Sequence, residues 1–183
     1  MKNDELIIKL DAIRSGDTMA FEELYDDLKT PIYTIVYRII WDKTASEDIM
    51  QEVFVKLYLS PPKPSIKNPR AYIFQMARNL AIDNTRKHRQ HISLDEMDNT
   101  THQPSIAHQL SDNFHNKIDI ENALKAIPAQ ECQIVTLHII GELKFREIAE
   151  VMQIPLGTVL WKYQKALGKL KRIISGEDEP CRN

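Results

Sequence analysis

Glycine, cysteine and long apolar runs are all scarce in this chain, and each shortage excludes a class of protein. Five glycines in 183 residues leave no glycine-rich loop for phosphate binding, and there is no nucleophile-elbow motif. Cys132 and Cys181 have no metal-ligand spacing, which fits a reducing cytoplasm. No apolar run approaches about 18 residues. The first residues lack the apolar centre of a signal peptide, so we expect neither membrane insertion nor export.

Catalytic and metal-binding patterns are also missing. His88 and His91 have H-x-x-H spacing, but no cysteine or carboxylate cluster accompanies them, which favours the solvated end of a basic helix. Asp48 and Glu52 lie one helical turn apart without a pocket pattern around them. That spacing favours a solvated or protein-docking face over acid–base catalysis. We therefore expect no enzyme activity, no metal and no cofactor.

The charges are segregated along the chain, although the formal net charge is only −2. Residues 66–91 carry six Lys and Arg against one Asp, and residues 156–172 carry five Lys and Arg with no acid. Each stretch is net +5, so the rest of the chain carries −12. Segregated positive charge of this kind is the electrostatic pattern of a nucleic-acid-binding protein.

The segment 68–91, NPRAYIFQMARNLAIDNTRKHRQH, predicts a helix with two chemically distinct faces. At about 100° per residue, its apolar side chains gather on one arc and its amide and guanidinium side chains on the other. The polar arc contains Gln75, Arg78, Asn79, Asp83, Arg86 and Arg89, with Tyr72 and Ile82 as its apolar members. Guanidinium and amide groups bind phosphates and contact bases, so this face is a candidate DNA-binding surface.

Helical patterns fill most of the remaining chain. Gly16-Asp17 reads as a helix stop followed by an N-cap, and Thr44 with Glu47 matches a capping box. The proline-rich segment SPPKPSIKNP cannot be helical, and Pro69 then suits the first turn of the next helix. Near the C-terminus, FREIAEVMQIPLGTVLWKYQKALGKLKRI predicts a helix-turn-helix whose second helix has a basic outer face.

The expected fold is all-α, with two small helical domains. We place the N-terminal domain at residues 1–92 and the C-terminal helix-turn-helix domain at 117–175. The polar segment 93–116 lacks apolar periodicity and is interpreted as a flexible linker, and 176–183 as a tail.

The order of these motifs resembles the extracytoplasmic function (ECF) sigma factors, the small promoter-specificity subunits of bacterial RNA polymerase. The resemblance covers about Ala20 to Ile174. SEDIMQEVFVKLY is similar to the family's helix that docks on the polymerase clamp, and ARNLAIDNTRKHR to its minus-ten helix. EIAEVMQIPLGTV matches the helix-turn-helix that reads the minus-thirty-five element. The resemblance implies core RNA polymerase and promoter DNA, both duplex and melted, as partners. An anti-sigma factor is also implied.

The resemblance also assigns roles to individual residues. Core-polymerase binding falls on Asp48, Gln51, Glu52 and Phe54. Binding and melting of the minus-ten element fall on Tyr72, Arg78, Asn79, Asp83, Arg86 and Arg89. Minus-thirty-five binding falls on Thr158, Trp161, Lys162, Lys165 and Lys169. The loop Ser60–Asn68 occupies the place of the loop that captures an extruded base.

Two departures from the family pattern stand out. Tyr72 replaces a common tryptophan, and Leu160-Trp161-Lys162 replaces a KSR-like sequence in the recognition helix. Trp161 lies about 200° from Val159, opposite the core, where it either contacts DNA or packs against another protein. The competing interpretation of the whole chain is a stand-alone helix-turn-helix regulator, but a dimerisation domain does not need the second basic face at 68–91.

Overall fold

The computed structural model describes residues 3–63, 65–95 and 115–175, with side chains placed at 3–63, 65–88 and 120–175. Within these ranges the chain forms α-helices and no strands, which confirms the predicted all-α class. The helices are α1 (Asn3–Arg14), α2 (Thr18–Ile40), α3 (Lys43–Leu59), α4 (Pro69–Asp95), α5 (His115–Ala126), α6 (Ala129–Ile139), α7 (Phe145–Met152) and α8 (Leu156–Ser175).

The start of α2 follows the predicted stop and cap. Gly16 takes the left-handed conformation at φ +92°, which lets the chain leave α1. The Asp17 carboxylate then accepts hydrogen bonds from the backbone N–H groups of Met19 (2.9 Å) and Ala20 (3.1 Å). The helix continues through Pro31 without a break in its assignment.

The start of α3 differs from the prediction. Asp42, not Thr44, is the N-cap, and its carboxylate accepts the Ala45 backbone N–H at 2.8 Å. Asp42 has the extended backbone of an N-cap residue (φ −119°, ψ 127°), whereas Thr44 already lies within the first helical turn. Both are cap-forming residue types, and the structure uses the one that comes first in the chain.

The boundaries of α4 define the edge of the N-terminal unit, α1–α4. Pro69 is its first residue, as predicted, and the Asn68 side chain accepts the Ala71 backbone N–H at 3.0 Å. The helix runs to Asp95 and α5 begins at His115. The segment predicted as a linker, 93–116, is thus helical at both ends, and its residues 96–114 lie outside the described ones.

The C-terminal unit, α5–α8, contains the predicted helix-turn-helix in α7 and α8. The turn between them is made by Gln153, which is left-handed at φ 55°, followed by Ile154 and Pro155. Three rings join α6, α7 and α8, because His138 stacks on Phe145 (4.3 Å) and meets the Tyr163 ring edge-on (5.0 Å). These contacts fix the angle at which α8 leaves the turn.

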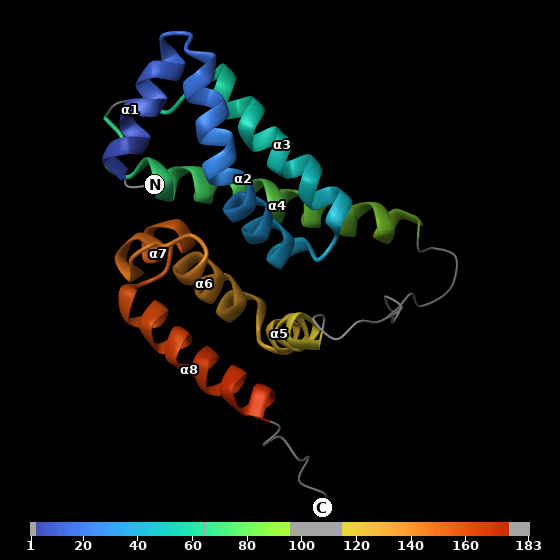
Figure 1. Ribbon diagram of the computed structural model, residues 1–183. Helices are drawn as coiled ribbons and strands as arrows, with labels where there is room; N and C mark the ends of the chain where they lie inside the picture. Colours follow the sequence, from blue (N-terminus) through green and yellow to red (C-terminus); the bar gives the residue numbers. More distant parts are fainter. Residues whose placement is uncertain (1–2, 64, 96–114, 176–183) are drawn as a thin grey trace, which may run out of the picture.

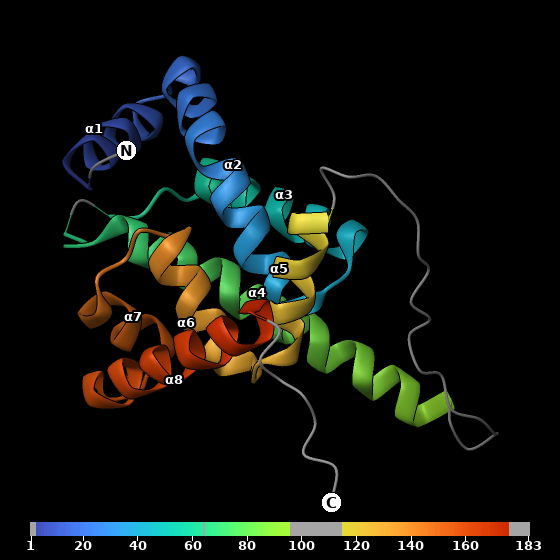
Figure 2. The same cartoon turned by 60° about the horizontal axis from the view of Figure 1, so that its bottom comes forward.

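The two units pack against each other, an arrangement that the sequence did not predict. In Figure 1, α4 crosses the middle of the molecule, with α1–α3 on one side and the C-terminal unit on the other. Figure 2 shows α7 still next to α4 after rotation, while α6 packs on α2. A single apolar cluster includes Phe74 of α4 together with Ile134 and Leu137 of α6. The described part of the chain is therefore one packed body.

Candidate nucleic-acid interface

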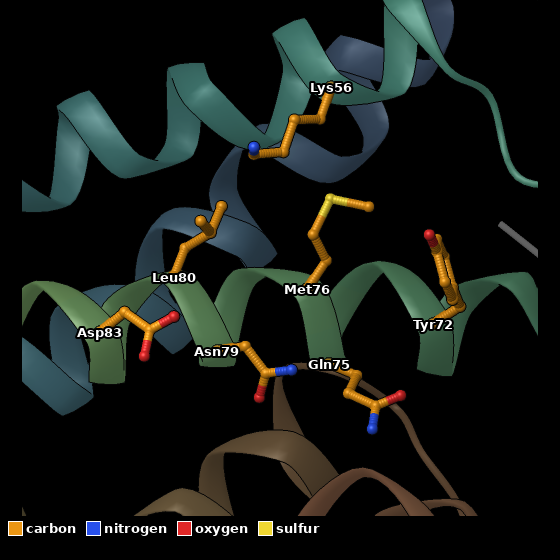
Figure 3. Close-up of a pocket in the computed structure, with 7 residues that line it drawn as sticks. All are labelled: Lys56, Tyr72, Gln75, Met76, Asn79, Leu80 and Asp83. Carbon is orange, nitrogen blue, oxygen red and sulfur yellow. The ribbon is translucent and has the colours of Figure 1, made fainter.

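The polar face of α4 borders a groove between α3 and α4. The groove has a volume of about 360 Å³ and is lined by Lys56, Tyr72, Gln75, Met76, Asn79, Leu80 and Asp83. Figure 3 shows Lys56 reaching down from α3 toward Met76 and Leu80, while Gln75 and Asn79 point away from α3. Tyr72 stands at one end, with 37% of its surface exposed. An aromatic ring, a cation and amides in one groove suit a nucleotide strand.

The charged side chains of α4 differ in their exposure to solvent and in their bonding partners. Asp83 and Arg86 are exposed and form a loose ion pair at 3.9 Å, which solvent weakens. Arg78 is half-buried, and its Nε donates a hydrogen bond to Gln133 Oε1 of α6 at 3.0 Å. Burial lowers the pKa of Arg78 from its ordinary value. Arg89 belongs to α4, but its side chain lies outside the described ones.

Three of the predicted polymerase-docking residues are exposed, and the fourth is buried. Asp48, Gln51 and Glu52 are exposed on α3, and Glu52 pairs with Lys56 at 3.2 Å. Phe54 is only 3% exposed. Its ring packs on Tyr25 at 4.6 Å, so Phe54 supports α3 from beneath and is not available for direct contact. The polymerase contact predicted for Phe54 stays a prediction, and in this structure Phe54 belongs to the core.

The outer face of α8 is formed by Trp161 and nearby lysines. Trp161 is 58% exposed, opposite the buried Val159, as its position on the helix predicted. The ammonium groups of Lys165 and Lys162 lie 4.6 Å and 5.8 Å from the Trp161 ring centroid. These cation–π contacts hold the ring against the basic side of the helix. Thr158 is half-buried at the start of α8.

Lys169 forms an ion pair with a buried carboxylate of α6. Its Nζ lies 3.1 Å from Glu131 Oε2, and the Glu131 side chain is only 3% exposed. A buried carboxylate requires a compensating charge, and Lys169 provides it. Lys169 therefore stabilises the C-terminal unit, while its predicted contact with DNA stays a prediction, as do those of Thr158, Trp161, Lys162 and Lys165.

Two groove residues were absent from the predicted site. Gln75 was placed on the polar arc but given no role, although it lines the groove with Asn79. Lys56 follows Glu52 by four residues, so in the sequence it reads as an ordinary helical ion pair. Only the packing of α3 on α4 reveals that Lys56 faces the groove.

The described residues contain neither a metal-binding cluster nor a helix able to cross a membrane. Nowhere among them do three or more His, Cys, Asp or Glu side chains gather closely enough to hold a metal ion, and the His91 side chain lies outside them. Over the same ranges, every helix is too short or too polar to cross a membrane.

Comparison with known proteins agrees with the two-unit organisation. The family described as Sigma-70 region 2 matches residues 24–91, and the family described as Sigma-70, region 4 matches residues 117–170. The ECF RNA polymerase sigma factor SigW of Bacillus subtilis is 26% identical over 181 residues, covering 92% of this chain and 97% of SigW. SigM of the same organism is 26% identical and covers 74% of this chain and 83% of its own.

Solved structures show the same fold. The sigma factor RpoE of Bartonella quintana, in complex with the anti-sigma factor NepR, aligns with a TM-score of 0.67 and 16% identity. That alignment covers 85% of this chain and 96% of RpoE. CnrH, in complex with the cytosolic domain of CnrY, aligns with a TM-score of 0.64 and 17% identity, covering 94% and 98%. With both sigma regions present in order, the chain belongs to the ECF sigma factors, which are transcription initiation factors and not enzymes.

Proposed function

We propose that this chain binds core RNA polymerase in the cytoplasm and directs it to promoters by holding the minus-ten and minus-thirty-five elements on separate helices. The observation that carries the proposal is the presence of two outward basic faces, on α4 and on α8, in units joined by one chain. A stand-alone regulator needs only the second face. Two faces suit a protein that fixes both ends of a promoter.

The groove beside α4 would hold the melted minus-ten strand. Arg86 is exposed, and its loose pair with Asp83 can give way to a phosphate, while Asn79 presents an amide to a base edge. Tyr72 supplies a ring on which an unstacked base can rest, a contact worth about 1–3 kcal/mol per base. Lys56, on the opposite wall, adds a second cation to the path of the strand. Unstacking a base costs a few kcal/mol, which is the same order as these gains.

The exposed face of α3 would dock on the polymerase. Asp48, Gln51 and Glu52 form a polar surface on a helix whose other side is anchored by Phe54. Acidic and amide side chains on a rigid helix provide electrostatic complementarity to a basic partner surface. Asp48 and Gln51 do not line the groove, whereas Glu52 pairs with Lys56, which does.

The C-terminal unit would read the minus-thirty-five element in the major groove. Trp161 presents a flat apolar surface suited to a thymine methyl group or a sugar, and Lys165 and Lys162 are placed for phosphates. Because Trp161 departs from the usual family sequence, we expect a duplex preference different from that of typical relatives. An anti-sigma factor is a further proposed partner, supported by the fold shared with RpoE–NepR and CnrH–CnrY.

Run-off transcription with core polymerase tests the proposal directly. Sheared genomic DNA from the same organism should yield start sites that appear only when the protein is present, and their upstream sequences would give both promoter elements. Sequence-specific duplex binding without any new transcript would favour the stand-alone regulator.

Two substitutions separate the proposed roles. Glu52→Ala should weaken binding to core polymerase and leave the fold intact, whereas Glu150→Ala, an exposed glutamate on α7, serves as the control. Arg86→Ala should slow promoter opening without weakening polymerase binding, with Lys29→Ala on α2, which breaks a similar exposed pair with Asp26, as its control. Equal competition for core polymerase by Glu52→Ala and wild type would contradict the docking assignment.

A further inference from the structure

Helix α1 carries none of the predicted site residues, yet it is firmly fixed to the rest of the N-terminal unit. Leu6, Leu10 and Ile13 are buried in the same apolar cluster as the inner faces of α2, α3 and α4. On the surface, Lys9 Nζ donates a hydrogen bond to Asp27 Oδ2 of α2 at 3.1 Å. A helix held in this way can in turn hold a neighbouring segment in place.

The last residue of α1 contacts the loop between α3 and α4. Arg14 Nη2 donates a hydrogen bond to the Pro62 carbonyl, 48 residues further along the chain. Arg14 Nη1 donates to the Asp11 carboxylate, which orients the guanidinium group. Pro62 is buried, and a buried carbonyl is costly unless a donor meets it. Figure 1 shows the α3–α4 connection passing beside α1.

The loop needs donors from outside because its own sequence supplies few. Four of the ten residues in SPPKPSIKNP are proline, which has no backbone N–H to donate. Among the described loop residues, 60–63 and 65–68, the Ile66 N–H donates to the Lys63 carbonyl at 3.0 Å and closes one turn. A single turn inside the loop does not fix where the loop lies relative to α4. The contact from Arg14 joins the loop to a helix of the core.

The far end of the loop meets the groove beside α4. The Asn68 carbonyl accepts the backbone N–H of Tyr72 at 3.1 Å, and the Asn68 side chain accepts that of Ala71 at 3.0 Å. Figure 3 shows Tyr72 at one end of the groove, where its ring is the proposed support for an unstacked base. The loop therefore runs from the Arg14 contact at Pro62 to the residue that begins the turn carrying Tyr72.

We infer that Arg14 of α1 is a positioning residue for base capture, because it holds the Pro62 carbonyl and thereby keeps the loop Ser60–Asn68 in place beside Tyr72 before a base is extruded. This inference rests on the proposed function, since it presumes an unstacked base at Tyr72. A loop that already occupies its bound position loses little conformational entropy when the base arrives. Arg14 acts through the loop and does not itself contact the base.

The size of the effect follows from how often the released loop takes its bound position. If the loop without Arg14 is in that position about one-fifth of the time, the apparent affinity for a strand falls about fivefold. The affinity for a strand that lacks the captured base should not change, because the loop then has nothing to hold. The proposed phosphate contacts of Arg86 and Lys56 are the same in both cases.

Three full-length variants test the inference. Arg14→Ala removes the contact with Pro62. Lys29→Ala is the matched control, because Lys29 pairs with an aspartate three residues earlier at the surface, as Arg14 does. The two variants change the net charge equally, so general attraction to DNA is matched. Arg14→Lys keeps a cationic donor and should restore most of the lost affinity.

Holoenzyme assembled from each variant and core polymerase is titrated with a short single strand from the minus-ten element of a promoter mapped by run-off transcription. A set of strands with one abasic position each identifies the captured base as the position that matters most to wild type. Fluorescence anisotropy should show that Arg14→Ala binds the intact strand about fivefold more weakly than Lys29→Ala. Both variants should bind equally to the strand that is abasic at the captured position.

Hydrogen exchange measures the state of the loop without DNA. The Ile66 amide should exchange several-fold faster in Arg14→Ala than in wild type or Lys29→Ala, since loss of the Arg14 contact loosens its turn. Exchange at Leu28, in the buried middle of α2, should stay the same and so exclude general unfolding.

The outcomes separate the inference from the function on which it rests. Unchanged exchange at Ile66, or an equal loss of affinity for the intact and abasic strands, would overturn the role of Arg14. The second result would mean that Arg14 contacts a phosphate directly. A wild-type holoenzyme that is indifferent to every abasic position would instead contradict the base contact proposed at Tyr72.

Discussion

Lys169 offers a direct test of whether a basic residue on α8 serves DNA or the fold. Its ammonium group lies 3.1 Å from Glu131, whose side chain is 3% exposed, while the Lys169 side chain is 27% exposed. Replacing Lys169 by alanine leaves the Glu131 carboxylate buried without its cation. The same substitution at the exposed Lys165, one helical turn earlier, leaves no buried charge behind.

The expected loss follows from the degree of burial. Breaking a fully buried ion pair costs about 3–5 kcal/mol, and an exposed pair contributes about 0–1 kcal/mol. Lys169 lies between these limits, and water can enter once its side chain is removed, so we expect Lys169→Ala to lower the free energy of unfolding by about 2 kcal/mol. For a chain of this size that corresponds to a fall in Tm of about 4–8 °C.

Urea denaturation and duplex-binding measurements on the two variants would separate the roles. Lys169→Ala should lose stability, Lys165→Ala should lose duplex affinity, and neither should do both. The double variant Glu131→Gln with Lys169→Met should recover much of the lost stability, because no charge remains buried. If Lys169→Ala unfolds like wild type and loses duplex affinity as much as Lys165→Ala, the structural assignment is wrong.

Three further predictions concern other parts of the chain. Burial raises the pKa of Tyr37 to about 12. The contribution of the protonated Tyr37 to stability is therefore complete below about pH 10 and is lost as the pH rises through 12. Ultraviolet titration should show one late-ionising tyrosine in wild type that is missing in Tyr37→Phe. Gly141→Ala should destabilise by about 2 kcal/mol in thermal unfolding, because the new Cβ would lie 2.5 Å from the Leu137 carbonyl oxygen, whereas Gly168→Ala, with open space around it, should stabilise by about 0.5–1 kcal/mol. Trp161→Ala should weaken duplex binding without changing Tm, and unchanged duplex affinity would point to protein packing instead.

Local chemistry made much of the fold predictable from the sequence. The Gly16-Asp17 boundary, the position of Pro69 in α4 and the helix-turn-helix all depend on residues close together in the chain. The exposure of Trp161 also follows from helical geometry, since Val159 fixes which side of α8 is buried. Such features depend on interactions between residues a few positions apart, so the sequence is enough to predict them.

Contacts between distant segments were not predictable in the same way. Helical periodicity shows that α4 has an apolar side, but not that Arg78 on its polar side donates a hydrogen bond to Gln133 of α6. The partners Arg70 and Gly141 are 71 residues apart, and Lys169 and Glu131 are 38 apart. A lysine that neutralises a buried carboxylate has the same sequence pattern as one that faces DNA, so the pairing of Lys169 with Glu131 could not be predicted from the sequence.

The exposed face of α8 has an evolutionary consequence. Leu160, Trp161 and Lys165 contribute little to the interior of the protein, because the core of the C-terminal unit is formed by the opposite side of the helix, at Val159 and Ala166. Substitutions at such surface positions usually change stability by less than about 0.5 kcal/mol. Under the proposed role of α8, descendants of this chain can therefore acquire new promoter preferences one substitution at a time, without passing through unfolded intermediates. The recognition sequence and the scaffold that presents it are free to diverge at different rates.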